Sequence, residues 1–316
     1  MPRVPWDEHV RMESSAEGLP PLLVVQAGPG LPLLNERRRY RKLLGFEEHF
    51  SVYYWDRSGT GLHSLPPGSV GLETHLEETV GLIDRIAQTT RRTVTVLGVS
   101  IGGTLALLAR QRAPEAVERV VAVSPDLDTA ASDRHAYQRI LAAVREPRWR
   151  RLATKAAQLQ PPPCFDPAQF MLRAELLGHL GSLDAGASYS AQIRRTVLSI
   201  AGTYGPHRIP RVLANMNAST RALLPQYAKV DLISHWPRSP VPADLLFGEA
   251  DLLSPAEVID RVRPLLGPQD TLRVIHGAAH MAHFDAPVVV RSVILGPKRS
   301  GSRVPAQNGA PHPGIA

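Results

Sequence analysis

The sequence predicts an α/β fold in which helices flank a mostly parallel central sheet. Three observations predict it: short apolar runs alternate with helical patterns, those runs show no polar alternation, and this rhythm pauses in mid-chain and then returns. Strands that alternate with helices form βαβ units, and strands that are apolar throughout are typical of a sheet covered on both faces. A length of 316 residues suits one large domain that carries an insertion.

The first half of the chain supplies four of the expected strands and two helices. In the first helix, Leu76, Val80 and Ile83 share one face at helical spacing. The expected strands cover residues 22–26, 51–55, 93–97 and 119–123, and the expected helices cover residues 76–86 and 103–112.

The middle of the chain predicts a helical cap or lid inserted into this core. Residues 128–238 contain no clear strand but show helical stretches at 135–144, 168–179 and 189–200. The α/β rhythm then returns with expected strands at 242–247 and 271–275 and expected helices at 255–266 and from residue 287. The predicted core therefore comprises residues 1–127 and 239–296, and residues 297–316, rich in Gly, Pro and polar residues, are expected to form a disordered tail.

Composition excludes several classes of protein. An apolar fraction of 43% with 21% charged residues is ordinary for a globular chain. The net charge of +7 comes almost entirely from arginines spread along the chain, which we interpret as a solvated basic face, so no nucleic-acid partner is expected. The single cysteine, Cys164, excludes an intramolecular disulfide. No apolar run reaches the length of a membrane span and no signal-peptide pattern opens the chain, so we expect a cytoplasmic protein without a membrane partner.

The sharpest chemical signal is the sequence Gly98-Val99-Ser100-Ile101-Gly102, which fits the G-x-S-x-G nucleophile elbow. An apolar strand is expected to run into it and an apolar helix to leave it, as that motif requires. Side chains two residues before and after the serine would collide in so tight a turn, which explains the glycines. The turn raises the Ser100 hydroxyl above the sheet edge and places the Ile101 N–H at a helix N-terminus, where it can stabilise an oxyanion.

A serine hydroxyl needs a base to take its proton, and the base is expected on a loop after a late strand. His280 follows the expected strand 271–275 closely and is the favoured base. His283 and His276 are the alternatives: His283 is expected to open the next helix, and His276 directly ends the strand.

The base needs a carboxylate that fixes its tautomer and stabilises its charge. Asp251 follows the expected strand 242–247 at its carboxyl end and is the favoured acid. Asp126, after the strand 119–123, is the main alternative, whereas the neighbouring Glu249 is expected to point away. The chain order serine, aspartate, histidine is the order of the α/β-hydrolase triad.

A second oxyanion donor is expected from the loop after the first apolar strand, which reads Gln26-Ala27-Gly28-Pro29-Gly30. Small residues let the backbone approach a ligand closely. The N–H of Ala27 or Gly28 is the candidate donor, because proline has none.

Together these pieces resemble the α/β-hydrolase superfamily, and within it the branch that contains proline iminopeptidases. That branch carries a His-Gly-Gly-Pro-Gly segment, matched here by Gln26–Gly30, and an Asp-Gln-Arg-Gly-x-Gly segment, matched by Asp56–Gly61. Here Gln26 replaces the histidine, Ala27 replaces the first glycine, and Arg57 lies one position earlier than the arginine of the family. The N-terminal strand pair of the family is expected to be reduced to residues 9–13.

The resemblance implies that the insertion is a lid over the triad. The expected serine mechanism calls for no metal or organic cofactor. Iminopeptidases of this branch hold the free amine of the substrate with acidic groups in the insertion, but here Glu175 and Asp184 stand isolated among arginines. This composition favours a neutral or anionic substrate. The polar and aromatic residues that are candidates for a lid pocket are Tyr189, Tyr204, His207, Asn215, Asn217, Tyr227, His235 and Trp236.

The sequence thus predicts a serine hydrolase that cleaves an ester or amide bond of a small molecule or short peptide through an acyl-enzyme. Within this class an esterase or specialised metabolic hydrolase is favoured over a proline iminopeptidase-type aminopeptidase. The alternatives from other classes are a non-hydrolytic acyltransferase, cyclase or lyase that uses the same triad, and a binding protein without catalytic activity.

Overall fold

The computed structural model describes residues 8–64 and 70–296. Seven strands form one sheet in the order β1-β3-β2-β4-β5-β6-β7. All neighbouring strands are parallel except β1, which pairs antiparallel with β3. The strands are β1 (Val10–Glu13), β2 (Pro21–Val25), β3 (Ser51–Trp55), β4 (Val94–Val99), β5 (Val117–Val123), β6 (Ala243–Gly248) and β7 (Thr271–Ile275). The predicted fold class is confirmed, and each expected strand exists within two residues of its predicted bounds.

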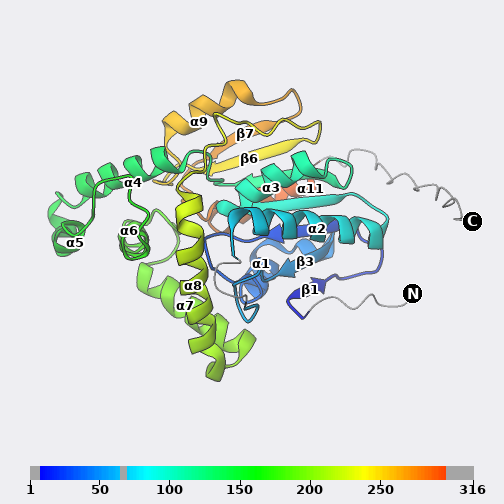
Figure 1. Ribbon diagram of the computed structural model, residues 1–316, viewed down its shortest axis with the longest axis horizontal. Coiled ribbons are helices and arrows are strands. Elements are labelled where there is room, and N and C mark those ends of the chain that lie inside the picture. Colours follow the sequence, from blue (N-terminus) through cyan, green and yellow to red (C-terminus); the bar gives the residue numbers. More distant parts are fainter. Residues whose placement is uncertain (1–7, 65–69, 297–316) are drawn as a thin grey trace, which may run out of the picture.

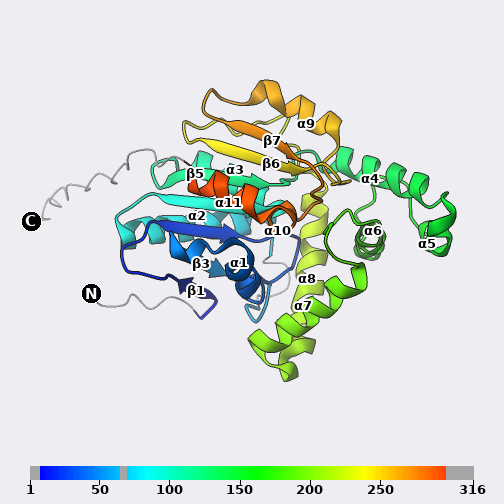
Figure 2. The same ribbon diagram turned by 180° about the vertical axis from the view of Figure 1, so that it is seen from behind.

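Helices cover both faces of this sheet (Figures 1 and 2). Helices α2 and α3 lie in front of the sheet in Figure 1, and α1 and α11 lie in front of it in the reverse view of Figure 2. The core helices are α1 (Arg37–Leu44), α2 (Leu72–Thr90), α3 (Ile101–Arg112), α9 (Ala256–Val262), α10 (Ala282–Asp285) and α11 (Pro287–Leu295).

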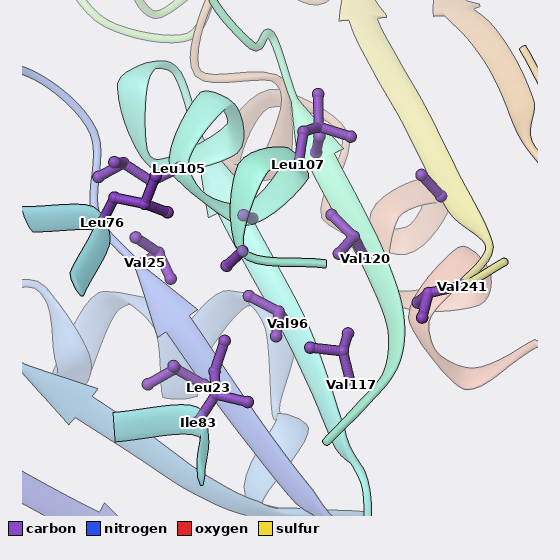
Figure 3. Packing of buried hydrophobic residues seen from close by; sticks show 14 of the residues in the cluster. Leu23, Val25, Leu76, Ile83, Val96, Leu105, Leu107, Val117, Val120 and Val241 are labelled. Atoms are coloured by element: carbon purple, nitrogen blue, oxygen red, sulfur yellow. The ribbon is translucent and has the colours of Figure 1, made fainter. Parts of the chain in front are cut away.

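Side chains alternate between the two faces of a strand, so inner strands such as β2, β3 and β4, covered on both faces, are fully buried, whereas the edge strands β1 and β7 are partly exposed. On β2, Leu23 and Val25 pack into the cluster that contains α2 and α3, while Leu22 and Val24 pack into the opposite cluster. Figure 3 shows the first cluster, in which Leu105 of α3 lies among the side chains of the strands and α2. Burying one such side chain contributes roughly 2 kcal/mol, so the two buried faces of the inner strands hold the sheet between its helical layers.

The segment between β5 and β6 holds five helices and no strand, apart from an isolated bridge between Asp128 and Asp231. These helices extend beyond one end of the sheet in both views (Figures 1 and 2). They are α4 (Thr129–Ala143), α5 (Arg150–Ala156), α6 (Pro167–His179), α7 (Tyr189–Tyr204) and α8 (Ile209–Tyr227). The helical composition agrees with the expected insertion, whose boundaries at 128 and 238 stay a prediction.

Some elements differ from the sequence-based expectation. Helix α1 was not among the expected helices; its sequence is rich in arginine, and only Tyr40 and Leu44, one helical turn apart, bury its inner side. The expected helix 255–266 ends early and continues as a 3-10 turn over Arg263–Leu265, because Pro264 has no N–H for the helical ladder. Further 3-10 turns occupy Phe46–Glu48, Pro147–Trp149 and Pro206–Arg208.

The expected disordered tail, residues 297–316, lies outside the described residues. In the part of the chain that the structure describes, no helix is long and apolar enough to cross a bilayer. The cytoplasmic location stays a prediction.

Candidate active site

Ser100 lies on a strained turn between β4 and α3. Its backbone has φ 55° and ψ −127°, a conformation that L-residues rarely adopt. The Ile101 N–H opens helix α3, so that helix supplies no acceptor for it. The strand, the strained serine and the helix N-terminus are the context that the G-x-S-x-G motif requires.

The glycines of the elbow are explained by close backbone contacts. A Cβ on Gly98 would lie 2.2 Å from the Gly102 carbonyl oxygen, and a Cβ on Gly102 would lie 2.3 Å from the Val25 carbonyl oxygen. Both obstacles are buried backbone atoms, one in the first turn of α3 and one in β2, which cannot move aside. The turn therefore needs glycine at both positions.

Gly98→Ala is expected to lower the free energy of unfolding by roughly 2 kcal/mol or more, because overpacking a rigid core forces backbone shifts. The matched control is Gly81→Ala in helix α2, where an added Cβ meets no atom within 4 Å. That change should stabilise the protein by about 0.5–1 kcal/mol through helix propensity. Urea unfolding of both variants measures the difference, and equal effects would contradict the steric explanation.

His280 and Asp251 meet at the carboxyl ends of β7 and β6. The Nδ1 atom of His280 lies 2.8 Å from Oδ2 of Asp251, and both residues are buried. Asp251 also accepts hydrogen bonds from the Ser254 hydroxyl at 2.7 Å and the Leu253 N–H at 2.8 Å. A Cβ on Gly248 would lie 2.2 Å from the Ala279 carbonyl oxygen, so glycine there lets the two loops approach. The arrangement leaves Nε2 of His280 as the ring nitrogen that can accept a proton.

The two side chains shift each other's pKa in opposite directions. Burial favours the neutral form of Asp251, but the charge and hydrogen bond of His280, with the bonds from Ser254 and Leu253, hold the pKa of Asp251 below its ordinary 3.8. Burial alone lowers the pKa of His280, and the carboxylates of Asp251 and Asp126 overcome that effect and raise it above 6.5. The pair is therefore arranged to stabilise a charged imidazolium.

The alternative histidines lie elsewhere. The His276 side chain is 94% exposed and pairs at the surface with Glu249 at 2.6 Å. His283 is buried, stacks against Tyr40, and has Nε2 3.1 Å from the Tyr40 hydroxyl. Burial holds the pKa of His283 well below its ordinary range. Of the three histidines, His280 alone is both buried and hydrogen-bonded to a candidate acid, Asp251.

Asp126, which was expected only as an alternative acid for the histidine, contacts the candidate nucleophile Ser100 instead. It follows β5, and its Oδ2 accepts a hydrogen bond of 3.0 Å from the Ser100 hydroxyl. The Tyr227 hydroxyl at the end of α8 also hydrogen-bonds to this carboxylate. Burial raises the pKa of Asp126 above 3.8, and His280, Tyr227 and Ser100 partly oppose the shift. Its position at the carboxyl end of a parallel strand is the signal that points to it in the sequence.

The loop that carries Ala27 and Gly28 is fixed from two sides. The guanidinium of Arg57, fully buried, donates a hydrogen bond of 3.1 Å to the Gly28 carbonyl, and burial lowers the pKa of Arg57 to about 10. The Thr220 hydroxyl of α8 lies 3.0 Å from the Pro29 carbonyl oxygen and 2.7 Å from the Met216 carbonyl oxygen, and its one proton is shared between these acceptors. Arg57 therefore positions the loop even though it lies one residue earlier than the family arginine.

The helical segment between β5 and β6 also forms hydrogen bonds with the two loops that carry His280 and Asp251. The backbone N–H of His280 donates to the Ser182 carbonyl at 3.0 Å, and the Ser182 hydroxyl accepts from the Leu252 N–H at 2.8 Å. Asp184 was expected to be isolated, but it accepts hydrogen bonds of 2.8 Å from both Arg39 and Arg195. Sequence reasoning missed these contacts because they join residues far apart in the chain.

A cavity of about 130 Å³ lies beside the candidate site, between the loop after β2 and the loop that follows His280. Its lining includes Gln26, Ala27, Leu31, Met281 and His283. Within residues 8–64 and 70–296, the side-chain amide of Gln26 and the Nδ1 atom of His283 are buried and have no hydrogen-bond partner. A second cavity, of about 430 Å³, opens around Asp184 and Arg195.

The seven-stranded, mostly parallel sheet between two layers of helices has the α/β-hydrolase fold. The sequence profile of the serine aminopeptidase S33 family matches residues 45–287. The chain therefore belongs to that family.

Individual relatives agree with this placement. The probable aminopeptidase YbaC of Bacillus subtilis (strain 168) is 23% identical over 276 residues, which cover 85% of each chain. The crystal structure of the proline iminopeptidase of Mycobacterium smegmatis matches with a TM-score of 0.60 at 16% identity, over 90% of this chain and 92% of that one. A proline iminopeptidase-related protein of Thermus thermophilus matches with a TM-score of 0.57 at 20% identity, over 90% of both chains. At these identities the structural matches establish the shared fold.

Proposed function

We propose that this hydrolase is a serine hydrolase that cleaves an ester or amide bond of a small molecule or short peptide through Ser100, His280 and Asp251. One observation carries the proposal: a buried His280–Asp251 hydrogen bond of 2.8 Å lies at the sheet edge where Ser100 sits on a strained elbow. Three side chains from three separate loops have the chemistry of a nucleophile, a base and an orienting acid.

The proposed reaction has two stages. Nε2 of His280 takes the proton of the Ser100 hydroxyl as Oγ bonds to the acyl carbon, and it then gives that proton to the leaving alcohol or amine. In the second stage His280 takes a proton from water, whose oxygen bonds to the acyl carbon, and returns it to Ser100 as the ester breaks. Asp251 holds the imidazolium in both stages.

The proposed oxyanion donors are the N–H groups of Ile101 and Ala27, with Gly28 as the alternative to Ala27. Support comes from the contact between elbow and loop: a Cβ on Gly102 would lie 2.4 Å from the Gln26 carbonyl oxygen. The peptide that joins Gln26 to Ala27 thus lies against the start of α3. Two preorganised N–H groups at that place would stabilise the charge that develops on the carbonyl oxygen.

We propose that the insertion, residues 128–238, is the lid of this site. Helix α8 brings the Tyr227 hydroxyl to Asp126 and the Thr220 hydroxyl to the Pro29 carbonyl. Ser100 is 6% exposed and His280 is 3% exposed. A lid that covers the nucleophile to this degree excludes water and must move to admit a substrate.

An aminopeptidase is the second candidate within this class. The family match carries that description, and so does the relative from Bacillus subtilis. A panel of 4-nitrophenyl esters and aminoacyl 4-nitroanilides separates the two activities by their kcat/KM values.

Fluorophosphonate labelling tests the proposed nucleophile. We expect a single adduct, mapped by mass spectrometry of the digested wild-type protein to Ser100, because only an activated serine attacks this reagent. The absence of an adduct on folded protein, or an adduct on another residue, would overturn the assignment of Ser100.

A further inference from the structure

Gln26 places a polar amide where the sheet pattern calls for an apolar side chain. Successive side chains of a strand point to opposite faces, and Leu22 and Val24 of β2 pack into the cluster that contains Tyr40. Gln26 continues this row just beyond the end of β2. It is 2% exposed, and in the described part of the chain neither Nε2 nor Oε1 has a hydrogen-bond partner. Leaving a buried amide unpaired costs about 1–3 kcal/mol, which points to a ligand that pairs with it.

Gln26 lines the cavity of about 130 Å³ beside the candidate site, together with two other buried polar side chains. Asn35 is 4% exposed and His283 is 1% exposed, and Oδ1 of the first and Nδ1 of the second also lack partners among the described residues. Leu31 and Met281 contribute apolar walls. A cavity of about 150 Å³ can hold benzene, so this one has room for a group of about five heavy atoms.

The cavity adjoins the place where the scissile carbonyl is expected. Ala27, the proposed oxyanion donor, follows Gln26 and also lines the cavity, and Met281 follows His280. A carbonyl oxygen held by the Ala27 N–H lies about 2.9 Å from that nitrogen, and the Cα atoms of Gln26 and Ala27 are about 3.8 Å apart. A chain of about one to three carbons has the length that joins a carbonyl held in this way to a group in the cavity.

We propose that this cavity binds a primary carboxamide of the substrate through Gln26, within a few bonds of the scissile carbonyl. The inference rests on the proposed serine-hydrolase function and adds a substrate class to it. Gln26 presents N–H donors and an acceptor oxygen side by side. The carboxamide oxygen accepts from Nε2 of Gln26 while one carboxamide N–H donates to Oε1. The second N–H donates to Oδ1 of Asn35.

The charges around the cavity favour an uncharged group. Its lining includes Glu36 and Arg39, whose Oε2 and Nη1 atoms lie 3.9 Å apart, and Arg39 also pairs with Asp184 at 2.8 Å. A carboxylate would accept from Nε2 of Gln26 but leave Oε1 unpaired, and an ammonium would leave Nε2 unpaired. A carboxamide satisfies both atoms and brings no charge that has to be desolvated.

Matched pairs of phosphonylating reagents test this proposal without a known substrate. In each 4-nitrophenyl ethyl phosphonate, the substituent on phosphorus ends in a carboxamide or in an isopropyl group of the same shape, after one, two or three methylene groups. Oγ of Ser100 bonds to phosphorus as 4-nitrophenolate leaves, and its release gives the second-order rate. At one or more chain lengths the wild-type protein should react at least tenfold faster with the carboxamide, because the isopropyl group leaves the polar atoms of the cavity unpaired.

Gln26→Met keeps the length of the side chain and removes the amide. In this variant the ratio of the two rates should fall to about one or below, since the methionine leaves no amide to satisfy. Gln88→Met is the matched control, because Gln88 is exposed near the end of α2 and is not part of the cavity lining. This variant should keep the wild-type ratio.

Equal rates for the two reagents at every chain length in the wild-type protein would overturn the proposal and mean that the cavity holds only water. An unchanged ratio in folded Gln26→Met would overturn the role of Gln26. Failure of a plain fluorophosphonate to label Ser100 would instead overturn the proposed function, so the two kinds of failure are distinguishable.

Discussion

Replacement of Ser100 by alanine is expected to lower kcat by about 10⁴-fold or more for the best substrate of an ester and aminoacyl-anilide panel. The acyl-enzyme cannot form without the hydroxyl, and the oxyanion donors alone retain only a small part of the rate enhancement. KM should change much less, because the missing group acts mainly in the chemical step. Steady-state kinetics on purified protein of unchanged melting temperature measures both quantities.

Ser124→Ala is the matched control for this prediction. Ser124 ends β5 as Ser100 ends β4, and it also has a positive φ, of 44°. Its hydroxyl is buried and, in the described part of the chain, has no hydrogen-bond partner. The control should keep activity within about twofold; a comparable loss in both variants would mean that Ser100 acts through the fold and not as the nucleophile.

The second large effect is expected from Asp251→Asn, which should lower kcat by about 10³–10⁴-fold. The amide can hold His280 in the wrong tautomer and no longer stabilises the imidazolium. The pH profile should change as well. A base must be neutral to act, so wild-type kcat/KM should rise with pH through a pKa above 6.5, as the raised pKa of His280 requires.

In Asp251→Asn the rise of kcat/KM should move to lower pH. Burial still lowers the pKa of His280, while the largest opposing interaction, the charge of Asp251, is gone. Glu249→Gln is the control, because this exposed neighbour pairs with His276 and should leave the profile unchanged. A profile of Asp251→Asn that coincides with the wild type would exclude Asp251 as the partner of the base.

Much of the fold follows from local sequence patterns. The continuous apolar run at residues 51–55 predicted a strand with its bounds, because the burial of both faces of a parallel strand removes all polar alternation. The elbow could also be predicted from a short segment of sequence. The G-x-S-x-G motif requires Gly98 and Gly102, because a Cβ at either position would collide with backbone atoms. Helix α1 was not found, because only Tyr40 and Leu44 are buried in a run of basic residues.

The sequence by itself determined the sheet, the elbow, and the positions of Asp251 and His280 at strand ends, because each depends on residues within one turn or strand. Only the tertiary structure decided that His280 meets Asp251 while His283 turns to Tyr40. It also decided that Asp126 takes the Ser100 hydroxyl and that Tyr227 reaches Asp126 from the insertion. These contacts join residues up to 243 positions apart in the chain, and they depend on how helices and loops pack around the sheet, which no local periodicity encodes.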